Sequence, residues 1–266
     1  MTISSTHHPT HLPPTVPGEY HLVDSGALRA VRGSVTARAE VVHQALRETI
    51  QATTFPCVAA KASVNTSAYA LGVYAGLGSL EATLGLAHDL ERFTRDQDAM
   101  DSGFSTMMAT FDTDEAMSEQ EFERLLWAQL RALHLLDTAP YSPEVSPDPT
   151  DPRFGFSFAG RAFFVVGVHP HSSRLARRFP VPALIFNAHR QFQSLRDTGR
   201  FDRMQSTIRT RDLTLQGSLN PNLANHGEAP EARQYSGRAV EPGWVAPFPS
   251  APAGGRCPFG HDTKGP

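Results

Sequence analysis

FFVVGVHPHSSRLARRFPVPALIFNAHRQF, residues 163–192, decides the fold of this chain, because two apolar runs in it are separated by a basic segment. The runs at 162–168 and 181–187 are short and rich in Val, Phe and Ile, which favours buried strands. FGFSF (154–158) comes just before them, and the Ala159-Gly160 turn region predicts a hairpin between 154–158 and 162–168. This part of the chain therefore predicts neighbouring strands of one sheet.

Further strands and helices are expected on both sides of this stretch. Apolar runs at 55–64 and 104–111 favour two more buried strands. Helices are predicted at 36–51, from Ser79 to about Arg95, and from Ser118 to about Asp137, where Ser118 and Glu121 match a capping box. A short basic helix (172–178) and a long polar helical region from His189 to Leu215 are also expected. The predicted apolar stripes are Val41, Val42, Ala45 and Leu46; Leu80, Leu84, Ala87 and Leu90; and Phe122, Leu125, Leu126, Leu130 and Leu133.

Strands interleaved with helices predict an α/β (α+β) fold, a mixed β-sheet covered by helices. Residues 1–20, rich in Pro, Thr and His, are expected to form a disordered lead-in whose His7, His8 and His11 are solvated. Residues 21–245 are expected to form a single catalytic domain, with a proline-rich connector at 138–152. The Gly- and Pro-rich end, 246–266, is predicted to be a mobile tail.

The composition excludes several classes of protein. A formal net charge of −3 over 266 residues gives no general attraction to nucleic acid or to an anionic membrane, and neither is expected as a partner. No apolar stretch reaches the length of a membrane span, and the first residues lack the pattern of a secretory signal. Two cysteines, Cys57 and Cys257, fit a reducing compartment, so a cytoplasmic location is expected.

Several catalytic motifs are missing from the sequence. It contains no G-x-G-x-x-G, no G-x-x-x-x-G-K, no G-x-S-x-G and no H-E-x-x-H, and it has no paired C-x-x-C zinc ligands. Dinucleotide binding through a glycine-rich turn, P-loop chemistry, α/β-hydrolase chemistry and zincin chemistry therefore lose their support.

Function-capable residues concentrate between 163 and 192. His169 ends one apolar run and His189 follows the next, so both imidazoles are expected at equivalent strand ends, on either side of a basic cluster. The cluster consists of Arg174, Arg177 and Arg178, and guanidinium groups bind carboxylates or phosphates bidentately. A dianion site beside an imidazole and an apolar wall suits a heme, although phosphate esters and flavins remain open on these residues alone. An exposed basic turn and core or capping histidines are the alternative interpretations.

Longer motifs resemble a known family. FPCVAAKA, LLWAQLRALHLLD, FFVVGVHPHSSRLARRFP, IFNAHRQFQSLRDTGRFDRM, TIRTRDLTLQGSLNPNL and EARQYSG are similar to the YqcI/YcgG family over roughly residues 50–245. The similarity is greatest to its branch of heme-dependent guanidine N-hydroxylases, of the cycloserine-pathway and pre-guanitoxin type. Asn222 is a departure, because NPML is expected where this chain has NPNL. The resemblance implies a heme b (iron protoporphyrin IX) monooxygenase that uses dioxygen and an external electron donor of the ferredoxin or flavin reductase type. Its substrate would be L-arginine or a similar amino acid.

On this hypothesis the candidate residues take the following roles. The axial ligand is His169, with His189 and then His134 as alternatives. Cofactor contacts are assigned to Arg174, Arg177, Arg178, His189 and Asn187, hydrogen bonds to bound oxygen to Ser172, Ser173 or Tyr235, and contacts with a cationic substrate to Asp212, Glu228 and Glu231. Cys57 in its apolar run is expected to be an inert thiol rather than a thiolate ligand, and Cys257 a spectator.

Three other functions remain open. The first is a heme-dependent oxygenase of another amine nitrogen. The second is a heme-binding or heme-sensing protein without turnover. The third is a non-heme protein that binds a phosphorylated small molecule through the arginine cluster.

Overall fold

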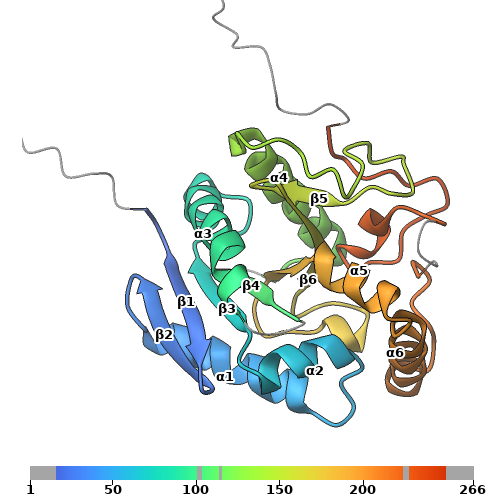
Figure 1. Ribbon diagram of the computed structural model, residues 1–266, viewed down its shortest axis with the longest axis horizontal. Helices are drawn as coiled ribbons and strands as arrows, with labels where there is room; N and C mark the ends of the chain where they lie inside the picture. The colour runs from blue at the N-terminus through green and yellow to red at the C-terminus, as the bar shows by residue number, and fades with distance from the viewer. Residues whose placement is uncertain (1–15, 101–103, 114–115, 224–227, 250–266) are drawn as a thin grey trace, which may run out of the picture.

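The computed structural model describes residues 16–100, 104–113, 116–223 and 228–249, and they form one mixed seven-stranded sheet covered by helices, as predicted (Figure 1). The strands are β1 (Glu19–Asp24), β2 (Ala27–Arg32), β3 (Tyr69–Tyr74), β4 (Thr106–Phe111), β5 (Phe156–Phe158), β6 (Arg161–Val168) and β7 (Ala183–Ala188). The helices are α1 (Ala37–Gln51), α2 (Val58–Asn65), α3 (Leu80–Ala99), α4 (Glu119–Leu136), α5 (His189–Asp197) and α6 (Phe201–Gln216), with 3₁₀ turns η1 (Leu175–Arg177) and η2 (Glu231–Gln234).

The order of the strands across the sheet is β2-β1-β3-β4-β7-β6-β5. Strands β3 and β4 run parallel, and the other neighbouring pairs are antiparallel. The hairpin β5–β6 around Ala159 and Gly160 is confirmed, with positive φ at both turn residues. Between β6 and β7 the register pairs Phe163 with Ala188 and Val168 with Ala183. This antiparallel register determines where the candidate residues that follow each strand lie.

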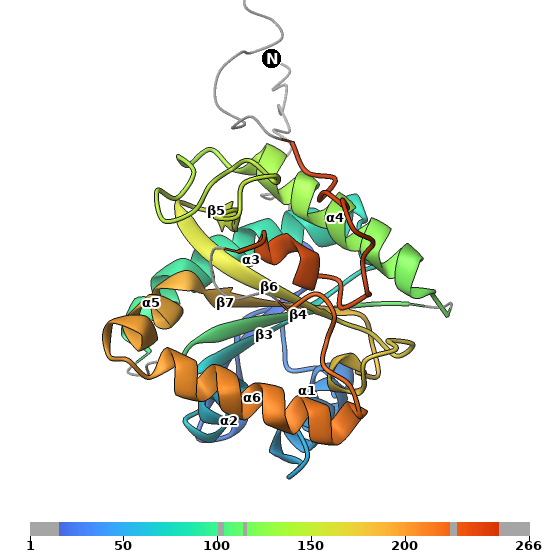
Figure 2. The ribbon, with the colours of Figure 1, turned by 90° about the vertical axis from the view of Figure 1, so that its right-hand side faces the viewer.

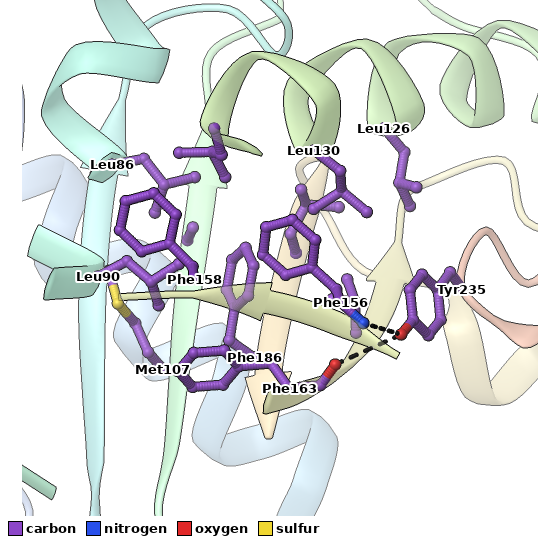
Figure 3. Close-up of a cluster of buried hydrophobic side chains, with 14 of the residues drawn as sticks. Leu86, Leu90, Met107, Leu126, Leu130, Phe156, Phe158, Phe163, Phe186 and Tyr235 are labelled. Carbon is purple, nitrogen blue, oxygen red and sulfur yellow. Dashed lines mark hydrogen bonds between the residues drawn. The ribbon is translucent and has the colours of Figure 1, made fainter. Parts of the chain in front are cut away.

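Helices α3 and α4 cover one face of the sheet, and α1, α2 and α6 lie on the other (Figure 2). The larger core lies beneath α3 and α4, where Leu86 and Leu90 of α3 and Leu126 and Leu130 of α4 pack with aromatic side chains of the sheet (Figure 3). A second core lies beneath α1, around Val42, Leu46, Leu71 and Met108.

The helix that follows Ser79 begins as predicted, but of its predicted buried stripe only Leu90 is fully buried. Ser79 Oγ accepts a hydrogen bond from Ala82 N, which caps α3. Leu80 and Leu84 are 73% and 44% exposed, whereas Leu86, Leu90 and Phe93 are fully buried. Both stripes have helical spacing, so periodicity alone could not choose between them.

The other two predicted helices are closer to the structure. Phe122, Leu126, Leu130 and Leu133 of α4 are fully buried, as expected. Ser118 caps α4 through Glu121 N, but the Glu121 carboxylate pairs with Arg124, so the reciprocal half of the capping box is missing. In α1, Val42 and Leu46 are buried and Val41 points to solvent.

The strand predicted at 55–64 is wrong, because Val58–Asn65 form helix α2. Three alanines favour helix over strand, and Cys57 Sγ caps the helix by accepting a hydrogen bond from Ala60 N. The basic helix at 172–178 shrinks to the turn η1, and the region 189–215 is broken at Thr198–Arg200 into α5 and α6. Strands β1, β2 and β3 were not predicted. Polar and apolar residues alternate weakly in β1 and β2, and β3 is a short apolar run, which periodicity alone does not distinguish from a buried helix.

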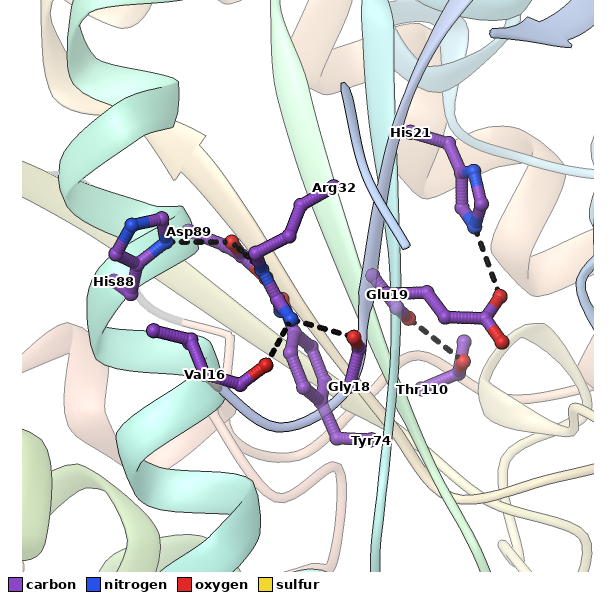
Figure 4. A network of polar contacts seen from close by, with 10 residues as sticks. Val16, Gly18, Glu19, His21, Arg32, Tyr74, His88, Asp89 and Thr110 are labelled. Carbon is purple, nitrogen blue, oxygen red and sulfur yellow. Dashed lines mark hydrogen bonds and ion pairs between the residues drawn. The ribbon is translucent and has the colours of Figure 1, made fainter. Parts of the chain in front are cut away.

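The folded part extends beyond both predicted tail boundaries. Glu19 and Tyr20 belong to β1, and Ala246 and Phe248 are buried in the larger core, so residues 246–248 are not a mobile tail. The N-terminal segment is held by Arg32, which donates to the carbonyl oxygens of Val16 and Gly18 and forms an ion pair with buried Asp89 (Figure 4). Residues 1–15 and 250–266, which include His7, His8, His11 and Cys257, lie outside the described residues.

No helix in the described part of the chain is both long and apolar enough to span a bilayer.

Candidate functional site

His169, the predicted axial ligand, directly follows β6 and is fully buried. Its ring stacks on Phe122 of α4, with centroids 4.4 Å apart, so it lies on the face of the sheet that α4 covers. Neither ring nitrogen has a hydrogen-bond partner. Burial lowers the pKa of His169, and this favours the neutral imidazole. The ring is therefore oriented by stacking on Phe122, and no hydrogen bond from a described residue fixes its tautomer.

The two histidines do not lie at equivalent strand ends. Strands β6 and β7 are antiparallel, so the residue after β6 lies at one edge of the sheet and the residue after β7 lies at the other. From Ala183 to Ala188 the strand advances by about 17 Å, and each histidine lies one residue beyond this span, so the two positions are more than about 17 Å apart along the sheet. One heme iron cannot be shared by both imidazoles, and the prediction of equivalent ends is wrong.

His189 begins α5 and is bound to a carboxylate. Its Nε2 lies 3.1 Å and 2.9 Å from the two carboxylate oxygens of Glu231 in η2. Burial lowers the pKa of His189, but the charge of Glu231, the hydrogen bond to it and the charge of Glu144 together outweigh burial, and the pKa is raised above its usual value. No described residue bonds to Nδ1. His189 therefore has one nitrogen held by an anion and the other available.

Tyr235 completes this arrangement. Its hydroxyl donates to Glu231 Oε1 at 2.5 Å and accepts from Phe156 N at 3.1 Å. The hydroxyl also lies 3.3 Å from Phe163 O, and Figure 3 shows it between the ends of β5 and β6. Burial and the Glu231 charge raise the pKa of Tyr235 well above its usual value, so the phenol stays protonated. The relay His189–Glu231–Tyr235 is thus anchored to the sheet backbone.

The segment 231–237, which carries Glu231 and Tyr235, packs closely against the backbone of β6. Gly167 N donates to Tyr235 O at 2.7 Å. A Cβ at Gly167 would come within 2.8 Å of Tyr235 O and 2.7 Å of Phe122 Cε1, so this position requires glycine. Arg177 reinforces the contact by donating to Gly167 O and Gln234 O, both at 3.0 Å. The segment 231–237 therefore covers the outer edge of β6.

The three predicted propionate partners are engaged within the protein. Arg174 forms a buried ion pair with Asp212 and donates to Ser218 O at 2.9 Å. Arg177 binds backbone carbonyls and has no ion pair with any described carboxylate, while burial lowers its pKa to about 10. Arg178 is exposed, and its Nε donates to Ser172 O. Each of the three arginines therefore binds a different partner within the protein, and together they do not form one dianion site.

The predicted substrate acids are likewise separated. Asp212 neutralises Arg174, and Glu231 holds His189. Glu228 is exposed and precedes η2. The structure thus assigns two of the three candidates to cations of the chain itself.

The remaining candidates are distributed around these groups. Ser173 donates from both its backbone N and its hydroxyl to Glu119 Oε1, and Ser172 caps the adjacent turn at Arg174 N. These contacts place both serines on the His169 side of the sheet, away from the relay. Asn187 donates to Phe164 O from the middle of the sheet.

Two further ligand candidates are structural in character. His134 is buried beneath Phe248, with its Nε2 unpartnered. Cys57 caps α2, and burial raises the pKa of its thiol, as expected of an inert cysteine.

The relay has a feature of metal-binding imidazoles that the predicted cluster lacks. Imidazoles that bind metals almost always donate their second nitrogen to a carboxylate or carbonyl, and His189 has such a partner whereas His169 has none. No group of three or more metal-ligating side chains occurs among the described residues, and a porphyrin needs only an axial ligand from the protein. His189 and Glu231 were predicted to have different roles, because they lie 42 residues apart and nothing in the sequence links them.

Comparison with known proteins identifies the family. The YqcI/YcgG family model matches residues 46–249. The chain is 31% identical to YqcI of Bacillus subtilis (strain 168) over 121 residues, 44% of this chain and 48% of YqcI, so the match spans about half of that relative. It is 26% identical to YcgG of the same organism over 210 residues, 73% of this chain and 81% of YcgG. No solved structure matches the chain. The family model covers most of the chain, including both halves of the relay, and the chain therefore belongs to the YqcI/YcgG family.

Proposed function

We propose that this protein is a heme-dependent N-oxygenase that hydroxylates a guanidine nitrogen of L-arginine or a similar amino acid. It would belong to the branch of its family with heme-dependent guanidine N-hydroxylases. The observation that carries the proposal is the relay His189–Glu231–Tyr235, in which an imidazole is oriented by a carboxylate that is itself hydrogen-bonded. His189 replaces His169 as the preferred axial ligand.

The relay favours ligation through Nδ1 of His189. A proton on Nε2 directed at Glu231 leaves Nδ1 with its lone pair, and this tautomer can bind iron. The Glu231 charge increases the electron density on the ring, and Tyr235 keeps the carboxylate from rotating. The chain's contribution is to orient the ligand and to hold one proton at Nε2.

When bound, heme b supplies the activation of dioxygen, which is chemistry that no side chain of the protein performs. Overall, one oxygen atom enters an N–H bond as N–OH and the other leaves as water. Two electrons from an external ferredoxin or flavin reductase and two protons complete the balance. We place the reaction in the cytoplasm, where such donors and reduced cysteines occur.

A guanidinium substrate needs an anion near it. Asp212, Glu228 and Glu231 stay the candidate acids for this contact, with Asp212 and Glu231 already paired with Arg174 and His189. An amine nitrogen is the alternative substrate.

The function is tested by incubating hemin-loaded protein with a flavin reductase, its reduced cofactor, arginine and ¹⁸O₂. We expect a product heavier by one labelled oxygen atom, and no product with His189→Ala. Oxygen transfer to lysine but not to arginine would move the substrate to an amine. A protein that binds hemin without consuming oxygen or either amino acid would contradict the oxygenase proposal and favour heme sensing.

A further inference from the structure

Glu123 and Arg238 form a buried ion pair that takes no part in the relay. Glu123 lies on α4 and Arg238 in the segment that follows η2, and their side chains are 10% and 12% exposed. We propose that Glu123 is a second binding site, which accepts the guanidinium group of a small molecule in place of the chain's own Arg238. This site is additional to the proposed function and involves neither heme nor His189.

Arg238 satisfies only half of the Glu123 carboxylate. Its Nε donates to Glu123 Oε2 at 2.5 Å, whereas Glu123 Oε1 is buried and has no hydrogen-bond partner. A buried carboxylate oxygen without a donor costs free energy. A guanidinium that presents two parallel N–H groups would bind both oxygens at once. The site can therefore hold a guanidinium in a better geometry than the one Arg238 adopts.

The same side of α4 carries two further buried polar atoms without partners. These are Trp127 Nε1 and His134 Nε2, and with Glu123 they lie within about 40° of one another around the helix. Trp244 and Phe248 of the C-terminal segment pack against Trp127. Phe248 also contacts His134, so this segment covers the polar side of α4 (Figure 2). The contact between α4 and the C-terminal segment is thus incompletely hydrogen-bonded.

Arg238 has a second carboxylate to which it can turn. Its Nη1 donates to Glu241 Oε1 at 2.8 Å, and Glu241 is 68% exposed. Asn222 holds the backbone at this point, since its side chain donates to Arg238 O and accepts from Val240 N. The Arg238 side chain can therefore swing outward with Glu241 while its own backbone stays in place. An inner and an outer position of one side chain make a two-state gate.

The space that the ligand would fill is the space that the Arg238 guanidinium now fills. The shape and charge of the site are therefore those of a planar cation with several N–H donors. An ammonium group is a compact point charge and does not reproduce this fork of donors. The ligand class is a small guanidinium compound such as free L-arginine, and amines are excluded.

The exchange is feasible because one cation replaces another. Removal of Arg238 alone would leave the buried charge of Glu123 uncompensated, which is strongly destabilising. When a ligand guanidinium takes its place, that charge stays compensated and Glu123 Oε1 gains a donor. Arg238 meanwhile keeps its exposed pair with Glu241. The ligand concentration therefore decides which guanidinium occupies the site.

The two tryptophans of the chain both lie at this site and report on it. Trp127 is one helical turn beyond Glu123, and the ring centroids of Trp127 and Trp244 are 5.9 Å apart. Their fluorescence is followed while heme-free protein is titrated with L-arginine at constant ionic strength, so the result does not depend on the proposed function. We expect a saturable change with L-arginine and none with L-lysine. A wild-type signal that L-arginine leaves unchanged would overturn the site.

Two carboxylates of α4 give a matched pair of variants. Glu123→Gln removes the buried charge and should abolish the response to L-arginine. Glu121→Gln, two residues earlier and 45% exposed, should leave the response intact. A response that survives in Glu123→Gln would place the bound arginine elsewhere and contradict the site.

The gate is tested without altering the buried carboxylate. Glu241→Gln is a surface change that takes away the outer partner of Arg238, so it should weaken the binding of L-arginine several-fold. Arg238→Ala removes the competitor and should strengthen binding by roughly tenfold or more, since an outer position populated about a tenth of the time or less weakens the wild type by that factor. Binding by Arg238→Ala but not by wild type would show that Arg238 and Glu123 are a permanent structural pair, and would overturn the gate.

Discussion

At the scale of single residues, the structure does not bring the predicted cluster of arginines and histidines together, but it does bring together His189, Glu231 and Tyr235. The arginines and histidines between 169 and 189 looked like one site in the sequence, but each has its own partner. Arg174 pairs with Asp212, Arg177 clamps carbonyl oxygens, and His169 stacks on Phe122. Among the candidate histidine ligands, His189 is the one bound to a carboxylate, that of Glu231.

Glu231→Gln tests this assignment directly. The neutral amide removes the charge that raises the pKa of His189, so that pKa should fall, as measured by NMR titration of the ring. Affinity for hemin should fall about 10- to 100-fold, the usual effect of losing such a partner. Glu48→Gln, at an exposed position of α1, is the control and should change neither quantity. An unchanged His189 titration in Glu231→Gln would contradict the relay.

The pair also makes stability depend on pH. Since the pKa of His189 is raised in the folded protein, its contribution is fully present below the unfolded value of about 6.5 and is lost as pH rises through the raised pKa. The difference in unfolding free energy between wild type and His189→Gln, from urea denaturation, should therefore shrink on raising the pH through that range. A difference that grew with pH would contradict the pairing.

At the scale of elements, α3 offers a matched pair of leucines. Leu90→Ala removes a fully buried side chain and should lower the free energy of unfolding by about 2–5 kcal/mol. Leu80→Ala, in the same helix but largely exposed, should change it by less than about 0.5 kcal/mol. Urea denaturation measures both, and equal losses would mean that the helix faces the core differently.

Helix α3 shows which features of a helix can be predicted from sequence and which cannot. Caps and helix starts at Ser79 and Ser118 were predictable, because a hydroxyl that accepts a backbone N–H is a local interaction. The buried side of α3 was not predictable, because two apolar stripes compete and tertiary contacts decide between them. The short run at 55–64 failed for a related reason, since strands and short buried helices share the same apolar pattern.

At the scale of the whole molecule, topology limited the prediction of the site. The strands that precede His169 and His189 were predicted, but their antiparallel pairing was not, and it places the two histidines at opposite edges of the sheet. Glu231 could not be linked to His189 without the path of the chain from α6 back to β6. The family resemblance suggested which residues are candidates for the site, and the fold shows which of these candidates are in contact.

The C-terminal segment also belongs to the fold. Phe248 packs against Trp127, His134, Phe154 and Phe156, with ring centroids 5.1–6.3 Å apart. Phe248→Ala should therefore cost about 3–5 kcal/mol of unfolding free energy and change the fluorescence of Trp127. A variant as stable as wild type would show that the segment is not part of the core.

The central claim is that His189 binds heme iron, and hemin titration followed by the Soret band tests it most directly. Wild type and His169→Ala should give the same ligated spectrum, whereas His189→Ala should lose it and recover it when imidazole is added. A ligated spectrum that survives in His189→Ala and disappears in His169→Ala, or a wild-type protein that gives none, would contradict the account.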